Sequence, residues 1–266
     1  MMTGLIHNLA ALLSLLPITI AVWRGRAARD GLFWALTAVA LAGPLGLVAV
    51  RYGTTWNSGL SEVLWVTVLV GIVLFALLSA VAAEAWRLAG LLFPYLILLG
   101  LVATIWDHAP AIDARAGTPS GWILVHILLS VVTYALLTLA AIAGLAVLLR
   151  ERGMRLKRRH MLSDVLPSIA DSERLQVRLL VASEGILGVD VLNGMGIQFL
   201  ETGQLLVFDH KTLFMLGAFV LIGVLLFAHY KAGLRGRRAA RWFLVAYLLV
   251  TLGYPGVKFV QDILLS

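Results

Sequence analysis

Residues 61–83 read SEVLWVTVLVGIVLFALLSAVAA, and after Glu62 this stretch contains no charged side chain. A helix needs about 20 apolar residues to cross the hydrocarbon core of a bilayer. Only helices and closed barrels satisfy their own backbone hydrogen bonds in lipid, and barrel strands alternate in polarity along the sequence. The uninterrupted apolar run therefore predicts a transmembrane helix and excludes an outer-membrane barrel.

The rest of the chain has the same character as this stretch. Of its 266 residues, 61% are hydrophobic and 13% are charged, whereas soluble domains carry about 25% charged residues. Candidate spans lie at 4–23, 31–50, 61–83, 88–106, 122–149, 175–193, 210–230 and 242–264. The sixth is the weakest because it contains Arg178, Glu184 and Asp190. We predict an all-α polytopic membrane protein, a bundle of about eight helices that forms one domain over 1–266.

The basic residues predict how the bundle lies in the membrane. Most of the 21 Lys and Arg residues fall in loops that eight alternating spans would place on one side, including the long loop 150–174. Such loops face the cytoplasm, so both termini are expected outside a plasma or inner membrane. The same bias accounts for the net charge of +7, so the basic residues do not indicate a nucleic-acid partner. The expected partner of these basic loops is the lipid bilayer. The chain has no cysteine, which excludes thiol chemistry and covalent haem attachment of its own.

The segment 193–209, NGMGIQFLETGQLLVFD, differs from the spans on either side of it. It is rich in glycine and too polar to face lipid, and the predicted topology places it outside, between the sixth and seventh spans. We predict an irregular or interfacial segment here, which could include a short amphipathic helix.

Two histidines are predicted at a similar depth near the outer surface. His126 lies about one helical turn inside the fifth span, and His210 begins the seventh span. Two imidazoles on separate helices could be the axial ligands of one haem iron. Neutral imidazole also suits zinc, copper or nickel, and both histidines could instead bond to backbone, water or a carboxylate.

Three cations lie near the same outer level, namely Arg51, Lys211 and Lys258. They could contact anionic groups such as haem propionates. Alternatively, they extend to the lipid headgroups or pair with nearby carboxylates. The candidate partners are Glu62, Asp209 and Asp262.

Two carboxylates fall inside the sixth span. Glu184 and Asp190 are six positions apart, so they occupy different faces of a helix and do not form a paired-carboxylate site. A proton relay and a structural role both remain open for them.

Short motifs in the second half of the chain resemble a known family. The fifth span contains His126, Ser130, Tyr134 and Ala135 in the pattern H-x-x-x-S-x-x-x-Y-A. Three more segments follow in order: DHKT at 209–212, GLRGRRAA at 233–240 and GYPGV at 253–257. Over 122–266 the chain is similar to the cytochrome c assembly membrane proteins of the CcsA and CcmC type. His210 followed by Lys211 and Thr212 resembles their HemX-like and YpjD-like branch.

The resemblance implies a haem-handling function. Members present haem b on a tryptophan-rich outer loop while histidines ligate its iron; here the corresponding segment 193–209 contains no tryptophan. We expect His126 and His210 to ligate haem, with Arg51, Lys211 or Lys258 near its propionates. The protein would be an accessory of cytochrome c assembly or haem homeostasis with other maturation components as partners, and not an enzyme. The alternatives are a scaffold or regulatory membrane protein without haem, and a transporter of a small solute or metal.

Overall fold

The computed structural model describes residues 2–26, 28–52, 59–107, 121–155, 165–205 and 210–256, and in these ranges it contains helices and no strand. The long helices are α1 (Met2–Trp23), α2 (Gly31–Tyr52), α3 (Leu60–Val81), α4 (Ala89–Ile105), α5 (Gly121–Arg155), α7 (Ile169–Thr202), α8 (His210–Ala232) and α9 (Gly236–Thr251). A 3-10 turn, η1 (Ala85–Leu88), precedes α4, and a π-helical turn, η2 (Leu252–Gly256), follows α9. The protein is an all-α polytopic membrane protein, as predicted.

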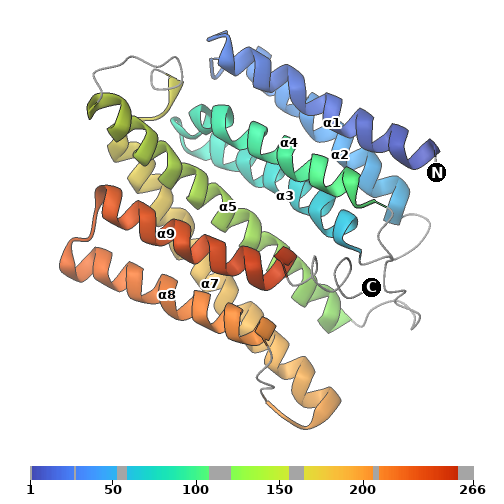
Figure 1. Cartoon of the computed structure of the whole chain (residues 1–266), viewed down its shortest axis with the longest axis vertical. Coiled ribbons are helices and arrows are strands. Elements are labelled where there is room, and N and C mark those ends of the chain that lie inside the picture. The colour runs from blue at the N-terminus through green and yellow to red at the C-terminus, as the bar shows by residue number, and fades with distance from the viewer. Residues whose placement is uncertain are drawn as a thin grey trace.

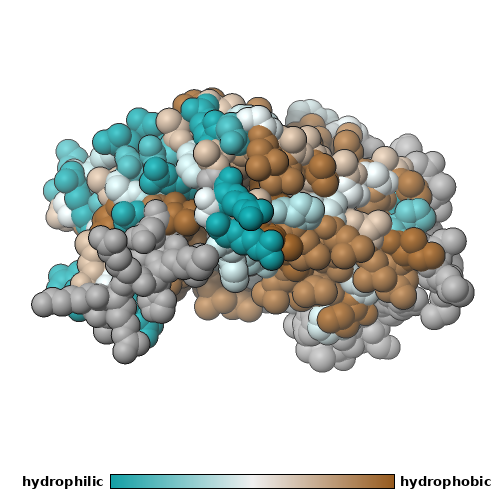
Figure 2. Space-filling model, turned by 90° about the horizontal axis from the view of Figure 1, so that it is seen from above, coloured by the Kyte–Doolittle hydropathy of each residue, from teal (hydrophilic) through white to brown (hydrophobic). Residues whose placement is uncertain are grey.

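The helices have the properties of membrane spans. Six of them within the described ranges are long and apolar enough to cross a bilayer. The other two differ for clear reasons, because α7 carries charged residues and α9 has only 16 residues. Large apolar side chains are exposed along the outside of the bundle, among them Leu13, Leu192 and Phe227. Figure 2 shows this hydrophobic surface, with hydrophilic residues gathered toward one end. A lipid-facing surface has this composition.

The bundle has two groups of helices with α5 between them (Figure 1). In the N-terminal group α1 packs on α2 and α4, and α3 connects this group to α5. In the C-terminal group α7 packs along α5, and α9 lies between α5 and α8. The apolar part of α5 is 78% buried, against 17–44% for the five other apolar spans. The helix that carries His126 is therefore the central element of the fold.

A cluster of hydroxyl groups joins the two halves of the bundle. Tyr95 of α4 and Tyr247 of α9 bring their hydroxyls to 2.5 Å, and Thr138 of α5 lies 3.0 Å from the Tyr247 hydroxyl. The Tyr134 ring stacks on Tyr247 with centroids 5.7 Å apart. Polar groups buried in an apolar interior need such partners, so this network fixes how α4, α5 and α9 fit together.

The prediction of an irregular segment at 193–209 is wrong over most of its length. Residues 193–202 continue α7, whose sequence-predicted end was residue 193, and the helix stops at Gly203, which adopts the left-handed conformation (φ 71°). A glycine at this position is the usual end of a helix because it lacks the Cβ that penalises positive φ. Residues 206–209 lie outside the described residues.

Helices α7 and α9 both begin before the apolar spans predicted at 175–193 and 242–264. Helix α7 begins at Ile169, where the Ser168 hydroxyl accepts the backbone N–H of Asp171 at 3.1 Å. Ser168 followed by Asp171 resembles a capping box in the sequence, and the structure confirms this cap. Helix α9 begins at Gly236, six residues before the predicted span. The GYPG motif forms the π turn η2, and Gly253 packs against Phe214 of α8. The rest of the predicted eighth span, after residue 256, lies outside the described residues.

Candidate functional site

The fifth helix presents His126 to a buried carboxylate of α7. Nδ1 of His126 lies 2.8 Å from Oδ1 of Asp190, which is ion-pairing distance, although the ring N–H is not aligned for a straight hydrogen bond. Neither atom has another hydrogen-bond partner among the described residues. The Asp190 side chain is 3% exposed, whereas the imidazole is 33% exposed. The carboxylate is therefore held inside the bundle, and the ring extends from it toward the surface.

The other oxygen of the same carboxylate is held by α5. The Ser130 hydroxyl donates to Oδ2 of Asp190 at 2.5 Å. Ser130 follows His126 by four positions, so both side chains lie on the face of α5 that packs against α7. The H-x-x-x-S spacing thus places a serine where it fixes the aspartate that contacts the histidine.

Helix α7 is shaped to receive the imidazole one turn beyond Asp190. A Cβ at Gly194 would lie 3.1 Å from Cε1 of His126, closer than side-chain carbons ordinarily approach. The adjacent Asn193 donates its amide to the backbone oxygen of Trp122 at 3.3 Å, which ties α7 to the first turn of α5. A glycine fits here because a Cβ would press on the ring, which would have to shift by a few tenths of an ångström.

These contacts leave one imidazole nitrogen available. With Nδ1 facing the carboxylate, Nε2 of His126 makes no hydrogen bond to any described residue. Histidines that ligate metals almost always direct their other ring nitrogen to a carboxylate, a carbonyl or water, which fixes the tautomer and raises the basicity of the ligating nitrogen. The cluster of His126, Asp190, Ser130 and Gly194, called here the His126 site, has the features of an oriented axial ligand.

The other predicted ligand and two of the predicted cations are only partly placed. His210 and Lys211 open α8, but their side chains lie outside the part of the chain that the structure describes. Lys258 lies outside the described residues altogether. In the described part of the chain, no three His, Asp or Glu side chains gather as a metal ion held by protein alone would need. A haem iron needs only axial ligands from the chain, since the porphyrin supplies the other four nitrogens.

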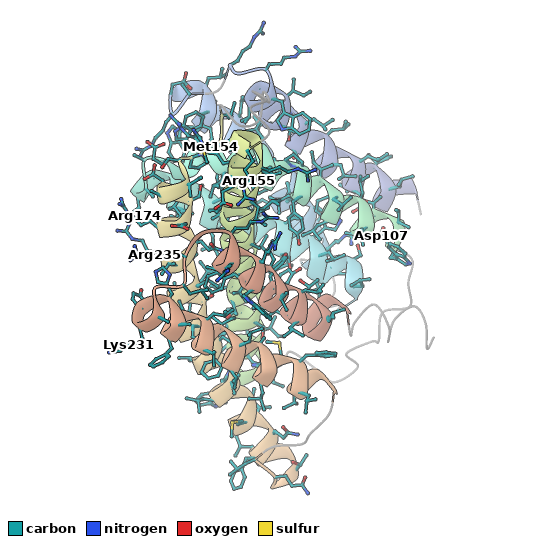
Figure 3. All side chains as sticks on the ribbon, turned by 60° about the vertical axis from the view of Figure 1, so that its left-hand side comes forward. Asp107, Met154, Arg155, Arg174, Lys231 and Arg235 are labelled. Atoms are coloured by element: carbon teal, nitrogen blue, oxygen red, sulfur yellow. The ribbon has the colours of Figure 1, made fainter. Side chains whose placement is uncertain are left out.

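Arg51 belongs to a different cluster. Its guanidinium lies 2.5 Å from Asp107 and 3.6 Å from Glu62, and it donates to Ser61 and Asn8 at 3.1 and 2.9 Å. This network connects α1, α2 and α3 to Asp107, which lies two residues after α4. Figure 3 shows Asp107 on the opposite side of the molecule from Arg174, Lys231 and Arg235. The pairing with Glu62 that was predicted as the alternative to a propionate contact is confirmed, and Asp107 is a closer partner that sequence reasoning missed.

The two carboxylates of α7 face different helices, as their spacing predicts. Asp190 contacts α5, whereas Oε1 of Glu184 lies 3.2 Å from where a Cβ of Gly223, on α8, would be. Oε2 of Glu184 has no hydrogen-bond partner among the described residues. The structure therefore assigns Asp190 to the His126 site and separates Glu184 from it.

Sequence reasoning left three members of the His126 site without a role. Asp190 was recognised only as a charge inside a span, and Ser130 only as part of a motif. Gly194 was placed in a segment predicted to be irregular. The available signal was the combination of an aspartate and a glycine four positions apart, because this spacing puts both on one face of a helix.

Comparison with known proteins gives the chain a family. Residues 56–265 match the family described as cytochrome c assembly protein. The chain is 46% identical over 271 residues to an "uncharacterized 28.8 kDa protein in nifR3-like 5'region" of Azospirillum brasilense, covering 100% of both chains. It is 27% identical over 199 residues to the inner membrane protein YpjD of Escherichia coli K12, covering 74% of this chain and 73% of YpjD. No solved structure matches.

Proposed function

The chain belongs to the cytochrome c assembly protein family and is a multi-pass protein of the inner membrane, and from this premise we propose that it binds haem b as a haem-handling accessory of cytochrome c assembly or haem homeostasis. One observation carries the proposal. Nδ1 of His126 is directed to a buried carboxylate while Nε2 is left without a partner among the described residues. The proposed ligands are His126 and His210.

The residues of the His126 site fit an axial ligand of haem. Haem, when bound, would supply an iron that accepts imidazole nitrogens as ligands. Asp190 orients the His126 ring and keeps the proton on Nδ1, and Ser130 holds Asp190 in place through its second oxygen. Gly194 leaves space for the ring against α7. Lys211 and Lys258 are the proposed partners of the propionates, while the guanidinium of Arg51 is already paired with Asp107.

The proposed role is binding and presentation, with no covalent chemistry carried out by this chain. The thiols that bond to haem in a c-type cytochrome belong to the apocytochrome itself. This chain contains no cysteine, so any thiol chemistry needed to prepare them would fall to other maturation components. The exposed part of the His126 ring lies near the end of α5, where a partner at the membrane surface could reach it.

A second candidate function is a scaffold or regulatory protein of the same family that binds no haem. The absence of tryptophan from 193–209 favours it, because the family members that present haem use tryptophans there. The continuation of α7 through residues 193–202 also favours it, since a helix occupies much of the segment that would otherwise form the presenting loop.

The experiment that separates the two candidates is purification from cells supplied with haem, followed by a pyridine haemochrome assay. We expect haem b in the wild-type protein and its loss in His126→Ala. His229→Ala is the matched control, because His229 bonds through Nδ1 to the Leu234 carbonyl at 2.8 Å, at the other end of the bundle. Wild-type protein without haem would support the scaffold, and equal haem in wild type and His126→Ala would refute the assignment of His126.

A further inference from the structure

A groove lies between the C-terminal end of α5 and the N-terminal end of α9, far along α5 from His126. It has a volume of about 460 Å³. Its lining combines three leucines, four arginines and one glutamate: Leu145, Leu148, Leu149, Glu151, Arg152, Arg155, Arg237 and Arg241. This volume is space for a lipid headgroup and not only for a single ion.

The α5 side of the groove changes from apolar to cationic along one helix face. Leu145, Leu148 and Leu149 follow the i, i+3, i+4 spacing of a single face, and Arg152 and Arg155 continue that face toward the end of the helix. About 15 Å of helix separates Leu145 from Arg155. This order matches an amphiphile whose chains lie in the membrane and whose anionic head lies at its surface.

The α9 side adds two more cations. Arg237 and Arg241 are four positions apart, so they share a face of α9 that borders the groove. The helix end itself is already satisfied, because the backbone N–H of Gly236 donates to Glu173. The side chains of the groove, and not the helix terminus, are therefore the groups available to an anion.

The four guanidinium groups have no ion-pair partner among the described residues. All four arginines are exposed, and none forms an ion pair or hydrogen bond with another described residue. Glu151 is the single acidic residue of the lining. Figure 3 shows Arg155 at the same end of the molecule as Arg174, Lys231 and Arg235, opposite Asp107. An anion at this groove would meet an uncompensated positive charge at the basic end of the bundle.

We propose that this groove binds an anionic phospholipid, with the phosphodiester between the arginines of α5 and α9 and the acyl chains along the three leucines. The guanidinium group donates in a fork that matches two phosphate oxygens, which favours arginine over lysine at phosphate sites. Basic pockets between transmembrane helices on the cytoplasmic side are a known form of lipid headgroup site. The bound lipid would fix the spacing between α5 and α9, because each helix contributes two arginines.

The test measures lipid retention by native mass spectrometry of the full chain, purified in neutral detergent with added phosphatidylglycerol, cardiolipin or phosphatidylcholine. We expect both anionic lipids to be retained and phosphatidylcholine to be released. The double variants R152Q/R155Q and R237Q/R241Q should each weaken lipid retention about thirty-fold. Each variant removes two arginines, and each arginine contributes about 1 kcal/mol at an anionic headgroup. Two separate pairs keep the test decisive if one of them fails to fold.

The control variant is R24Q/R26Q, which removes two arginines from another loop on the predicted cytoplasmic side. It should retain anionic lipid as the wild type does. Equal loss in the control, or full retention in both groove variants, would overturn the proposal. Inorganic phosphate at the same concentration should not displace the lipid; displacement would show a site for free phosphate in its place.

Discussion

Replacing Asp190 by asparagine tests how the His126 site works. The change keeps the shape of the side chain but removes the charge that lies 2.8 Å from Nδ1 of His126 and accepts from Ser130 at 2.5 Å. The contact with the ring is an ion pair and not an aligned hydrogen bond, so the change removes the charge that orients His126 but keeps the side chain in place. Mutation of a partner that orients a metal ligand typically weakens metal binding by about 10–100-fold. Because asparagine keeps the shape and one acceptor oxygen, we expect roughly tenfold weaker haem binding, the low end of that range.

Asp190→Ala should have a larger effect than Asp190→Asn. It removes both acceptor oxygens, and loss of a ligand-orienting partner typically weakens metal binding by about 10–100-fold. The assay is a haem titration of detergent-purified protein followed by its absorption spectrum. Glu184→Gln is the matched control, since it makes the same change of charge on α7 but on the face toward α8.

Two results would refute the reasoning. The first is equal weakening in Glu184→Gln and Asp190→Asn, because the effect would then come from the charge of α7 in general. The second is unchanged haem affinity in Asp190→Ala. If Asp190 orients the ring of His126, removing both carboxylate oxygens has to weaken haem binding.

The remaining predictions concern packing and topology. Gly194→Ala should weaken haem binding, because its Cβ would lie 3.1 Å from Cε1 of His126. The melting temperature should not fall, since alanine favours a helix by about 1 kcal/mol over glycine. A lower melting temperature with unchanged haem affinity would contradict this prediction. Tyr247→Phe should destabilise the bundle by about 1–3 kcal/mol by leaving buried hydroxyl partners unpaired, which thermal unfolding followed by circular dichroism would measure against the wild type. Because the chain has no native cysteine, single introduced cysteines can report its topology. Trp122→Cys should react with an impermeant maleimide in spheroplasts, and Met154→Cys should react only after lysis. The opposite pattern would show that the orientation in the membrane is the reverse of the predicted one.

The spans could be predicted because a bilayer imposes one strong requirement on sequence. A run such as 61–83 has to be helical in lipid, and the structure places α3 at Leu60–Val81. A helix at the weak sixth span is confirmed as α7, although α7 is not among the six described helices that are apolar enough to cross a membrane. Of its charges, Asp190 is buried against α5, whereas Arg178 is exposed. The extension of α7 through 193–202 could not be predicted, because a polar, glycine-rich segment is typical of a loop unless a neighbouring helix packs against it.

The candidate site was predictable only in part. His126 follows from its depth in a span, and the different faces of Glu184 and Asp190 follow from helical geometry. The contact between His126 and Asp190 depends on the axial register of α5 against α7, which sequence spacing does not determine. The same limit explains why Asp107, far from Arg51 in the chain, was not identified as its closest ion-pair partner. His210 as second ligand, and Lys211 and Lys258 as partners of the propionates, stay predictions.

The most direct measurement is the low-temperature electron paramagnetic resonance spectrum of the ferric, haem-loaded protein. Two axial imidazoles on one iron predict a low-spin signal in the wild type. Replacing either His126 or His210 by alanine should remove one ligand and convert this signal to high spin or abolish it, while His229→Ala should leave it unchanged. A high-spin wild type, or a low-spin signal that survives both replacements, would contradict ligation by these two histidines.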